Sequence, residues 1–195
     1  MNVLTELRTD RLLLRPWRPD DFAPFAHLNA DPVVMEFFPE PLSEQETGQL
    51  IERIAAHFTR HGFGLWAAES REHRQFIGYI GLGVPRFQAA FTPCVEIGWR
   101  LSSSHWGRGL AYEGAQAVVR HAFCTLDLPD LVSFTVPANL RSRRVMEKLR
   151  MTNDPADDFD HPSLPEGHPL RRHVLYRLTR EAWVARDSGA SGALY

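Results

Sequence analysis

The chain has 195 residues, of which 44% are hydrophobic and 24% charged, and its formal net charge is -2. These values are typical of one globular domain with a real hydrophobic core, and they exclude an intrinsically disordered chain. No basic excess of the kind that marks nucleic-acid-binding proteins is present, so we expect no nucleic-acid partner.

The sequence predicts a cytoplasmic protein that does not enter the membrane. It has no run of about 18 apolar residues that could form a transmembrane helix. Its first residues lack the basic stretch and apolar run of a signal peptide. The two cysteines, Cys94 and Cys124, are too few for a disulfide framework or a metal site. We therefore expect both to be reduced, small and buried.

The first predicted elements are a strand and two helices. The apolar run at 11–15 predicts the strand, and Asp20 is placed to cap a short helix after it. Ser43 and Glu46 form a capping box, which predicts the start of a longer helix. Its apolar face comprises Leu50, Ile51, Ile54, Ala55 and Phe58.

Three strand-like runs follow, at 65–69, 76–82 and 94–101. Their short separations predict hairpins and hence an antiparallel meander. A second long helix is expected from Gly107 to the Leu128-Pro129 pair. Its inner stripe comprises Leu110, Gly114 or Ala115, Val118, Ala122 and Leu126.

The C-terminal part predicts two more strands around one helix. A strand is expected at 131–136, and Asn139 is placed to cap the helix after it. Residues 152–170 predict a long loop, and 173–178 a final strand. The order β-α-α-β-β-β-α-β-α-β indicates a mixed α/β domain at 1–185, followed by a flexible tail at 186–195.

The segment that points to chemistry is Trp106-Gly107-Arg108-Gly109-Leu110-Ala111, between a predicted strand and a long helix. Glycines at a helix start let the backbone approach an anion, and the free amides there bind phosphate oxygens. Arg108 adds a positive charge. An ordinary turn explains the two glycines equally well. The segment lacks the third glycine of a Rossmann fingerprint and the lysine of a P-loop.

Together with the strand at 95–101 and with Glu113, this segment resembles the acyl-CoA motif of the GNAT superfamily of N-acetyltransferases, Gln/Arg-x-x-Gly-x-Gly/Ala. Trp106 departs from the usual first residue, while Gly109 and Ala111 match the fourth and sixth. The runs at 9–15 and 139–149 resemble the opening strand and the Asn-x-x-Ser-x-x-x-x-Glu-Lys-Leu helix of the RimJ/RimL-type branch, which acetylates ribosomal-protein N-termini. Arg150-Met151 replaces the Gly-Phe that usually follows.

The resemblance implies an acyl-CoA N-acyltransferase fold, in which a mostly antiparallel central sheet has splayed fourth and fifth strands and flanking helices. It implies acetyl-CoA as cosubstrate, with the pantetheine between the splayed strands. The acceptor it implies is a primary amine, either a protein N-terminus or a small molecule, and a homodimer is the assembly of many relatives. The implied cofactor-binding residues are Trp99, Arg100, Leu101, Trp106, Gly107, Arg108, Gly109, Leu110, Ala111, Asn139 and Ser142.

Transfer of an acyl group from a thioester to an amine requires a base for the amine and a proton for the leaving thiolate. Glu96 is the candidate base, acting through a water. Its alternative is an exposed strand carboxylate or an ion-pair partner of Arg100. Ser142 is the candidate proton donor, in the role proposed for the RimJ/RimL branch, and its alternative is a helix-capping hydroxyl.

The resemblance also implies that two loops border the acceptor site. The first holds Phe37 and Phe38, for which core packing is the alternative. The second is 152–170, where Asp158 and Asp160 are expected to attract a cationic amine. His173, just after this loop, is a second candidate for an acceptor contact or a base, and its alternative is a surface histidine at the end of a strand. The spacing of acidic and histidine residues in the loop matches no metal-ligand pattern, so no metal is expected.

Two other functions stay open. A non-catalytic acyl-CoA-binding or sensor module would need the same phosphate-binding loop, and the candidate catalytic residues Glu96 and Ser142 argue against it. Another nucleotide-binding enzyme could use residues 107–111 for phosphate, but the absent P-loop lysine and Rossmann glycine argue against that.

Overall fold

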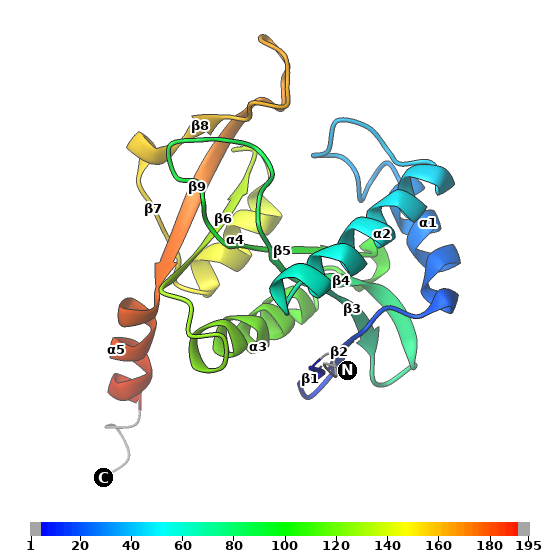
Figure 1. Ribbon diagram of the computed structural model, residues 1–195, viewed down its shortest axis with the longest axis horizontal. Helices are drawn as coiled ribbons and strands as arrows, with labels where there is room; N and C mark the ends of the chain where they lie inside the picture. The colour runs from blue at the N-terminus through cyan, green and yellow to red at the C-terminus, as the bar shows by residue number, and fades with distance from the viewer. Residues whose placement is uncertain (1–4, 191–195) are drawn as a thin grey trace. The chain divides into compact units, whose positions relative to one another are not determined.

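The computed structural model describes residues 5–190, and their side chains as far as residue 185. The chain divides into two compact units, each built from two segments (Figure 1). The first unit comprises residues 1–83 and 97–118, and the second comprises 84–96 and 119–195. The chain therefore passes between the units more than once. The predicted boundary of one domain at 1–185 stays a prediction.

The first unit contains an antiparallel succession of strands. These are β1 (Leu7–Arg8), β2 (Leu12–Arg15), β3 (Leu65–Ser70) and β4 (Gln75–Gly83), each paired with the next. β5 (Glu96–Leu101) follows β4 in the strand order. The predicted strands at 11–15, 65–69 and 76–82 are thus confirmed within one or two residues, whereas β1 was not predicted.

A glycine in β4 lets β5 come close. Gly78 has a φ of +137°, and a Cβ atom at this position would lie 2.0 Å from the carbonyl oxygen of Arg100. Any side chain there would displace the β5 backbone. Gly78 therefore sets the position of the strand whose residues were predicted to contact the cosubstrate.

The helices of the first unit are α1 (Phe22–Ala30), α2 (Glu44–His61) and the first turns of α3 (Leu110–Cys124). The capping box of Ser43 and Glu46 is confirmed, and Gly62 ends α2 in the left-handed conformation at φ +76°. The predicted cap by Asp20 is wrong. A single 3-10 turn at Pro19–Asp21 precedes α1, and no side chain caps the helix.

A cluster of aromatic and aliphatic residues forms the core between α1, α2 and β4. Phe25, Leu28, Val34 and Tyr79 are buried in it, and partly buried aromatic rings pack around them. The ring centre of Phe25 lies 4.8 Å from that of Trp17 in a tilted arrangement, and 6.0 Å from that of Tyr79 in an edge-on arrangement. Such ring pairs add to the stabilisation from burial alone.

The second unit is built on β9 (Arg172–Thr179), which pairs antiparallel with β6 (Asp130–Thr135). Two short strands also pair with β9, namely β7 (Thr152–Asn153) and β8 (Phe159–Asp160). The predicted loop at 152–170 is therefore partly regular structure, including a 3-10 turn at Pro155–Asp157. Glu96, the first residue of β5, pairs in parallel with Val132.

The helices of the second unit include α4 (Leu140–Lys148) and α5 (Arg180–Ala190). Asn139 caps α4 as predicted. The predicted tail at 186–195 is corrected in part, because residues 186–190 continue α5, and residues 191–195 lie outside the described residues. α3 ends at Cys124, earlier than predicted. Cys124 is exposed and Cys94 half-buried, so the expectation that both are buried is wrong.

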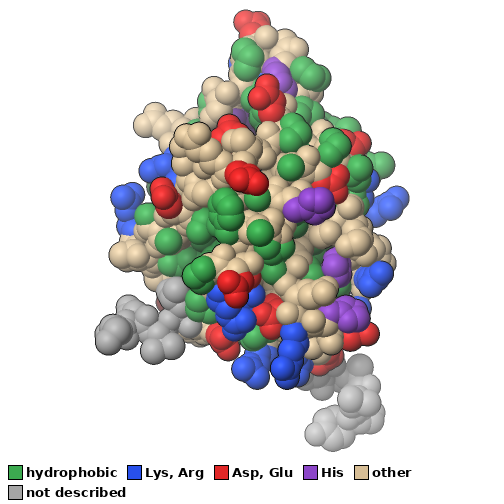
Figure 2. All heavy atoms as spheres, turned by 90° about the vertical axis from the view of Figure 1, so that its right-hand side faces the viewer, with side chains coloured by type: hydrophobic (Ala, Val, Ile, Leu, Met, Phe, Trp, Pro, Cys, Tyr) green, Lys and Arg blue, Asp and Glu red, His purple; other side chains and the backbone are tan. Residues whose placement is uncertain are grey.

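Among the described residues, no helix is long and apolar enough to cross a membrane. Figure 2 shows one face of the molecule, on which acidic, basic, histidine and hydrophobic side chains are interspersed. This mixture agrees with the small net charge of -2.

Candidate active site

The predicted phosphate-binding loop has the backbone geometry that an anion site requires. Gly107 and Gly109 have φ values of +73° and +78°, which favour glycine, and both are exposed. A Cβ at Gly107 would have no atom within 4 Å, so the space beside the backbone is open. α3 begins at Leu110, and the amide of Glu113 bonds the carbonyl of Gly109 at 3.0 Å. The amides that precede Glu113 in this first turn are therefore available to an anion.

An arginine from the N-terminal strand region braces this loop. Arg11 donates from Nε to Oε2 of Glu113 at 2.6 Å, and from Nη1 to the carbonyl oxygen of Arg108 at 2.8 Å. Thr9 donates to the second oxygen of Glu113 at 2.5 Å. Burial alone would raise the pKa of Glu113, but the hydrogen bonds from Thr9 and Arg11 outweigh it and hold the pKa below its ordinary value.

The side chain of Trp106 is hydrogen-bonded to the backbone of Leu101. The indole Nε1 of Trp106 donates to the carbonyl oxygen of Leu101 at 2.8 Å. The ring also packs against the core cluster around Phe25. The side chain of Trp106 is thus structural, and its place in the acyl-CoA motif depends on its backbone. Leu101 was among the strand residues predicted to pair with pantetheine. Its carbonyl oxygen already accepts this hydrogen bond from Trp106.

Arg100 is a buried arginine with no carboxylate beside it among the described residues of its unit. Its Nη1 donates to Oδ1 of Asn29 at 2.6 Å, and its guanidinium lies 4.0 Å from the centre of the Phe38 ring. The side chain is 8% exposed, and Nε has no hydrogen-bond partner there. Phe38, predicted to line the acceptor cleft, therefore packs on Arg100, which supports its core-packing alternative. Phe37 is half-buried in the same loop.

Glu96 has the environment of a proton acceptor that works near neutral pH. It pairs in parallel with Val132, so its side chain projects from the same sheet face as Val132 and, two residues along, Phe134. Burial raises the pKa of Glu96 to about 8. Its carboxylate has no hydrogen bond or ion pair within the described part of the second unit, so nothing there stabilises the charged form.

Six rings gather on this face of the second unit, and we name them the aromatic cluster. They come from the segment before β5, from β6, from β8 and its following residue, and from β9. The closest pairs are Phe87 with His161 at 4.6 Å and Phe91 with Phe159 at 4.7 Å between ring centres. All six are half-buried. The members are Phe87, Phe91, Phe134, Phe159, His161 and His173.

Only His173 of this cluster was a predicted site residue. Its ring lies 5.5 Å from Phe159 and 5.1 Å from His161. Sequence reasoning missed the four phenylalanines, because they lie far apart in the chain. The one available signal was Phe134, which alternates with Val132 along a predicted strand and so shares its face.

Asp158 and Asp160, the two predicted acceptor-binding carboxylates of the 152–170 loop, have partners within the second unit. Asp158 accepts hydrogen bonds from Asn153 Nδ2 at 2.9 Å and from the Leu175 amide at 3.3 Å. Asp160 forms ion pairs with Arg171 and Arg172, at 3.6 and 3.5 Å. These carboxylates fasten the loop to β9 and the residue before it, and the attraction of a cationic amine by Asp158 and Asp160 stays a prediction.

Asn139 and Ser142 form a linked cap at the start of α4. Oδ1 of Asn139 accepts from the Ser142 amide at 3.2 Å, and its Nδ2 donates to Ser142 Oγ at 3.1 Å. The same Nδ2 donates to Thr135 at 3.0 Å. Thr135 alternates with Phe134 on β6, so the cap lies toward the sheet face opposite the aromatic cluster. Asn139 is the residue that caps α4, and the Ser142 hydroxyl accepts from it, so the role of Ser142 as proton donor stays a prediction.

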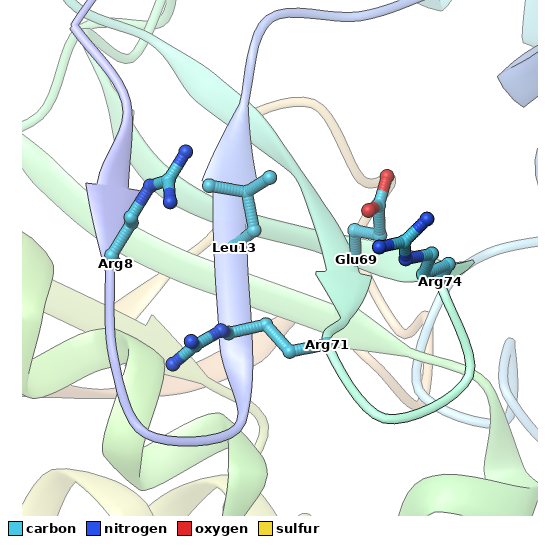
Figure 3. Close-up of a pocket in the computed structure, with 5 residues that line it drawn as sticks. All are labelled: Arg8, Leu13, Glu69, Arg71 and Arg74. Carbon is cyan, nitrogen blue, oxygen red and sulfur yellow. The ribbon is translucent and has the colours of Figure 1, made fainter.

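A pocket of about 300 Å³ opens in the first unit beside β1, β2 and β3 (Figure 3). None of the predicted site residues lines it. Glu69 in its wall bonds the buried Arg15 at 2.7 Å, so this carboxylate belongs to the scaffold. Within the described residues, no group of three or more metal-ligating side chains occurs. The residues that line the pocket are Arg8, Leu13, Glu69, Arg71 and Arg74.

Comparison with known proteins identifies a family for this chain. Residues 11–152 match the model of the acetyltransferase (GNAT) domain. The uncharacterised protein YkkB of Bacillus subtilis is 32% identical over 152 residues, which are 77% of this chain and 87% of that protein. The FsC-acetyl coenzyme A-N(2)-transacetylase of Aspergillus fumigatus is 32% identical over 189 residues, 91% of this chain and 77% of that protein.

Solved structures agree with this match. An acetyltransferase from Agrobacterium tumefaciens superposes with a TM-score of 0.71 at 32% identity, covering 89% of this chain and 94% of that one. RimL, a ribosomal L7/L12 alpha-N-protein acetyltransferase in complex with coenzyme A, reaches a TM-score of 0.74 at 16% identity, covering 91% and 99%. The second likeness establishes the fold alone.

Proposed function

The chain belongs to the GNAT family of acetyltransferases, with its mixed open sheet flanked by helices, and we propose that it transfers an acetyl group from acetyl-CoA to a primary amine. Glu96 is the observation that carries this proposal. A carboxylate whose pKa is raised to about 8 by burial is matched to an amine proton, and it lies on a sheet face lined by aromatic rings.

The cosubstrate fits the backbone of the loop that precedes α3. The open space beside Gly107 and the free amides of the first helical turn suit a pyrophosphate. Arg11 holds Glu113 and the Arg108 carbonyl, so this part of the loop is preorganised before any anion arrives. We assign the pyrophosphate to residues 106–111 and leave pantetheine contacts to β5, with Asn139 and Ser142 as further candidates.

The reaction makes one bond and breaks one. The neutral amine nitrogen attacks the thioester carbonyl carbon, a C–N bond forms, and the C–S bond breaks to release the CoA thiolate. The amine proton passes to Glu96 through a water, and from there to solvent. The thiolate takes its proton from solvent or from Ser142, the predicted donor, whose cap lies toward the sheet face opposite Glu96.

The names of the relatives indicate the chemical class of the acceptor and not its identity. The fungal relative is named as an N(2)-transacetylase and RimL as a protein N-terminal acetyltransferase. Both transfer to nitrogen, which supports an amine acceptor here. Because RimL is only 16% identical, we favour a small-molecule amine over a protein N-terminus, and we treat the RimJ/RimL branch as a prediction.

A direct test of the proposed function measures thiol release from acetyl-CoA in the presence of a panel of primary amines and N-terminal peptides. The proposal expects amine-dependent thiol release together with an acetylated product in the mass spectrum. Tight acetyl-CoA binding without turnover on any amine would instead favour the sensor module. Failure to bind acetyl-CoA would overturn the assignment of the loop.

A further inference from the structure

We propose that the aromatic cluster binds the acceptor, and that this acceptor is a primary amine carried on a flat apolar body, as in an arylalkylamine. The inference rests on the proposed function and names its substrate class. It concerns the second unit only, in which the cluster and Glu96 share one face of the strands.

The first step concerns the shape and exposure of the rings. Phe87 and Phe91 come from one loop, while Phe134 and Phe159 come from two strands. Phe134 lies 5.8 Å from Phe87 and 5.5 Å from Phe159, both edge-on. A closed core would bury such rings fully, but each of them keeps accessible surface. Flat, partly open rings offer stacking and edge-on contacts to another ring.

The second step concerns the two histidines, whose Nδ1 atoms are both engaged with backbone. His173 Nδ1 lies 3.1 Å from the carbonyl oxygen of Arg171, which only accepts, so Nδ1 carries the hydrogen. His161 Nδ1 accepts from the Ser163 amide at 3.2 Å, so in the neutral ring its hydrogen is on Nε2. The cluster therefore presents a lone pair on His173 Nε2 and a donor on His161 Nε2.

The third step concerns charge. Burial lowers the pKa of His173, although its backbone hydrogen bond opposes the shift, and burial together with His173 lowers the pKa of His161. Both rings are thus neutral near pH 7. Arg177 lies 6.0 Å from the Phe91 ring, but its Nε is bonded to Asp157 at 2.7 Å, which neutralises it.

These features select an uncharged amine with an apolar body. An apolar surrounding lowers the pKa of a bound ammonium, which generates the neutral nucleophile. Its N–H can donate to His173 Nε2. Glu96 pairs with Val132, and Val132 pairs with Arg177, four residues along β9 from His173, so Glu96 takes the released proton through water and not by direct contact. A polyamine would place charged groups against the rings, where Asp157, Asp158 and Asp160 already have partners within the second unit.

The first experiment compares 2-phenylethylamine with n-butylamine and spermidine. Binding is measured by NMR titration without acetyl-CoA, and acetylation by thiol release. We expect kcat/KM for 2-phenylethylamine to exceed that for n-butylamine by about tenfold or more. Equal or better use of the aliphatic amines would overturn the inference while the proposed function stands. If no amine is acetylated, the titration alone decides, and equal or absent binding of 2-phenylethylamine overturns the inference.

The second experiment changes the rings. Phe87→Ala and Phe91→Ala should each raise KM for 2-phenylethylamine by about tenfold, with a much smaller effect on n-butylamine. Phe22→Ala is the matched control, because Phe22 is 37% exposed on α1 and belongs to the other unit. A rise in KM that is equal for both amines, or equal in the control, would contradict an acceptor surface.

The third experiment distinguishes the roles of Nδ1 and Nε2 of His173. His173→Asn keeps a donor near the Nδ1 position, and so the bond to the Arg171 carbonyl, but removes Nε2. His173→Gln places an amide oxygen near Nε2 and removes the Nδ1 bond. If Nε2 receives the acceptor amine, kcat/KM falls by about tenfold more in the Asn variant than in the Gln variant. The reverse order would assign His173 a structural role and overturn this part of the inference.

Discussion

Arg11 and Glu113 lie 102 residues apart in the chain and form a double contact, with Nε and Nη2 of Arg11 both 2.6 Å from Oε2 of Glu113. The contact joins the turn before β2 to the first turn of α3. The same arginine holds the Arg108 carbonyl, so the loop proposed to bind pyrophosphate is fixed from outside. The runs at 9–15 and 106–113, whose resemblance first indicated the family, are therefore in direct contact with one another.

Replacing Arg11 should loosen that loop. For Arg11→Gln we expect acetyl-CoA affinity to fall by about tenfold, equivalent to about 1.4 kcal/mol, measured by calorimetry. Arg8→Gln is the control, because Arg8 is an exposed arginine of β1 whose ion pair is with Glu6 at 3.5 Å. Equal affinities of the two variants would show that the brace does not support cosubstrate binding.

Replacing Gly109 tests the phosphate-binding loop, and replacing Gly62 provides a control with a similar backbone strain. A Cβ at Gly109 would meet only the end of Arg11 at 3.6 Å, and its φ of +78° nearly equals the +76° of Gly62, which ends α2. Alanine should strain both positions similarly and lower stability by about 1 kcal/mol in each variant. Only Gly109→Ala should weaken acetyl-CoA binding. If both variants bind acetyl-CoA equally well, residues 106–111 do not form the phosphate site.

The fold was predictable where local chemistry decides it. The capping box of Ser43 and Glu46 and the cap of Asn139 both act within one helical turn, so the sequence alone specifies them. The cap by Asp20 failed, because the neighbouring Asp21 is held by two bonds from Arg15 of β2. The short strands β7 and β8 arise from pairing with β9, which two residues of local propensity cannot reveal.

The site was predictable only where its residues are adjacent in the sequence. The loop from Trp106 to Ala111 is contiguous, and its glycines do have the positive φ values that the motif requires. The aromatic cluster is assembled from segments that are distant in the chain, so no window of sequence contains it. The ion pairs of Asp157 and Asp160 could not be predicted from the loop itself, because their partners Arg177 and Arg171 follow it in the sequence.

The loop carboxylates should now act on stability. Asp158→Ala removes the acceptor for Asn153 and for the Leu175 amide, so the free energy of unfolding should fall by about 1–2 kcal/mol, measured by urea denaturation. The KM for the amine should barely change. Glu166→Gln, an exposed change in the same loop, is the control. A raised amine KM with unchanged stability would instead support the predicted recruiting role of this carboxylate.

Glu96 should also make stability depend on pH. Between about pH 4.3, where an unfolded glutamate titrates, and about pH 8 the folded protein binds a proton that the unfolded chain does not. The free energy of unfolding should therefore fall as the pH rises through this window. In Glu96→Gln this decrease should be smaller, so the variant gains stability relative to the wild type up to about pH 8.

Urea denaturation at pH 5, 7 and 9 measures this difference, and Glu44→Gln, an exposed change at the start of α2, provides the comparison. Parallel pH dependences of the wild type and Glu96→Gln would mean that the pKa of Glu96 is not raised in the folded protein.

The pH–rate profile of Glu96→Gln tests the central assignment most directly. With the titration of the amine measured separately and removed, kcat/KM of the wild type should rise with pH to a plateau beyond about pH 8, as Glu96 loses its proton. Glu96→Gln should lose that step, reduce kcat/KM by about 10² or more on the plateau, and keep its acetyl-CoA affinity. A folded, acetyl-CoA-binding variant that retains the wild-type profile within a few-fold would contradict Glu96 as the base.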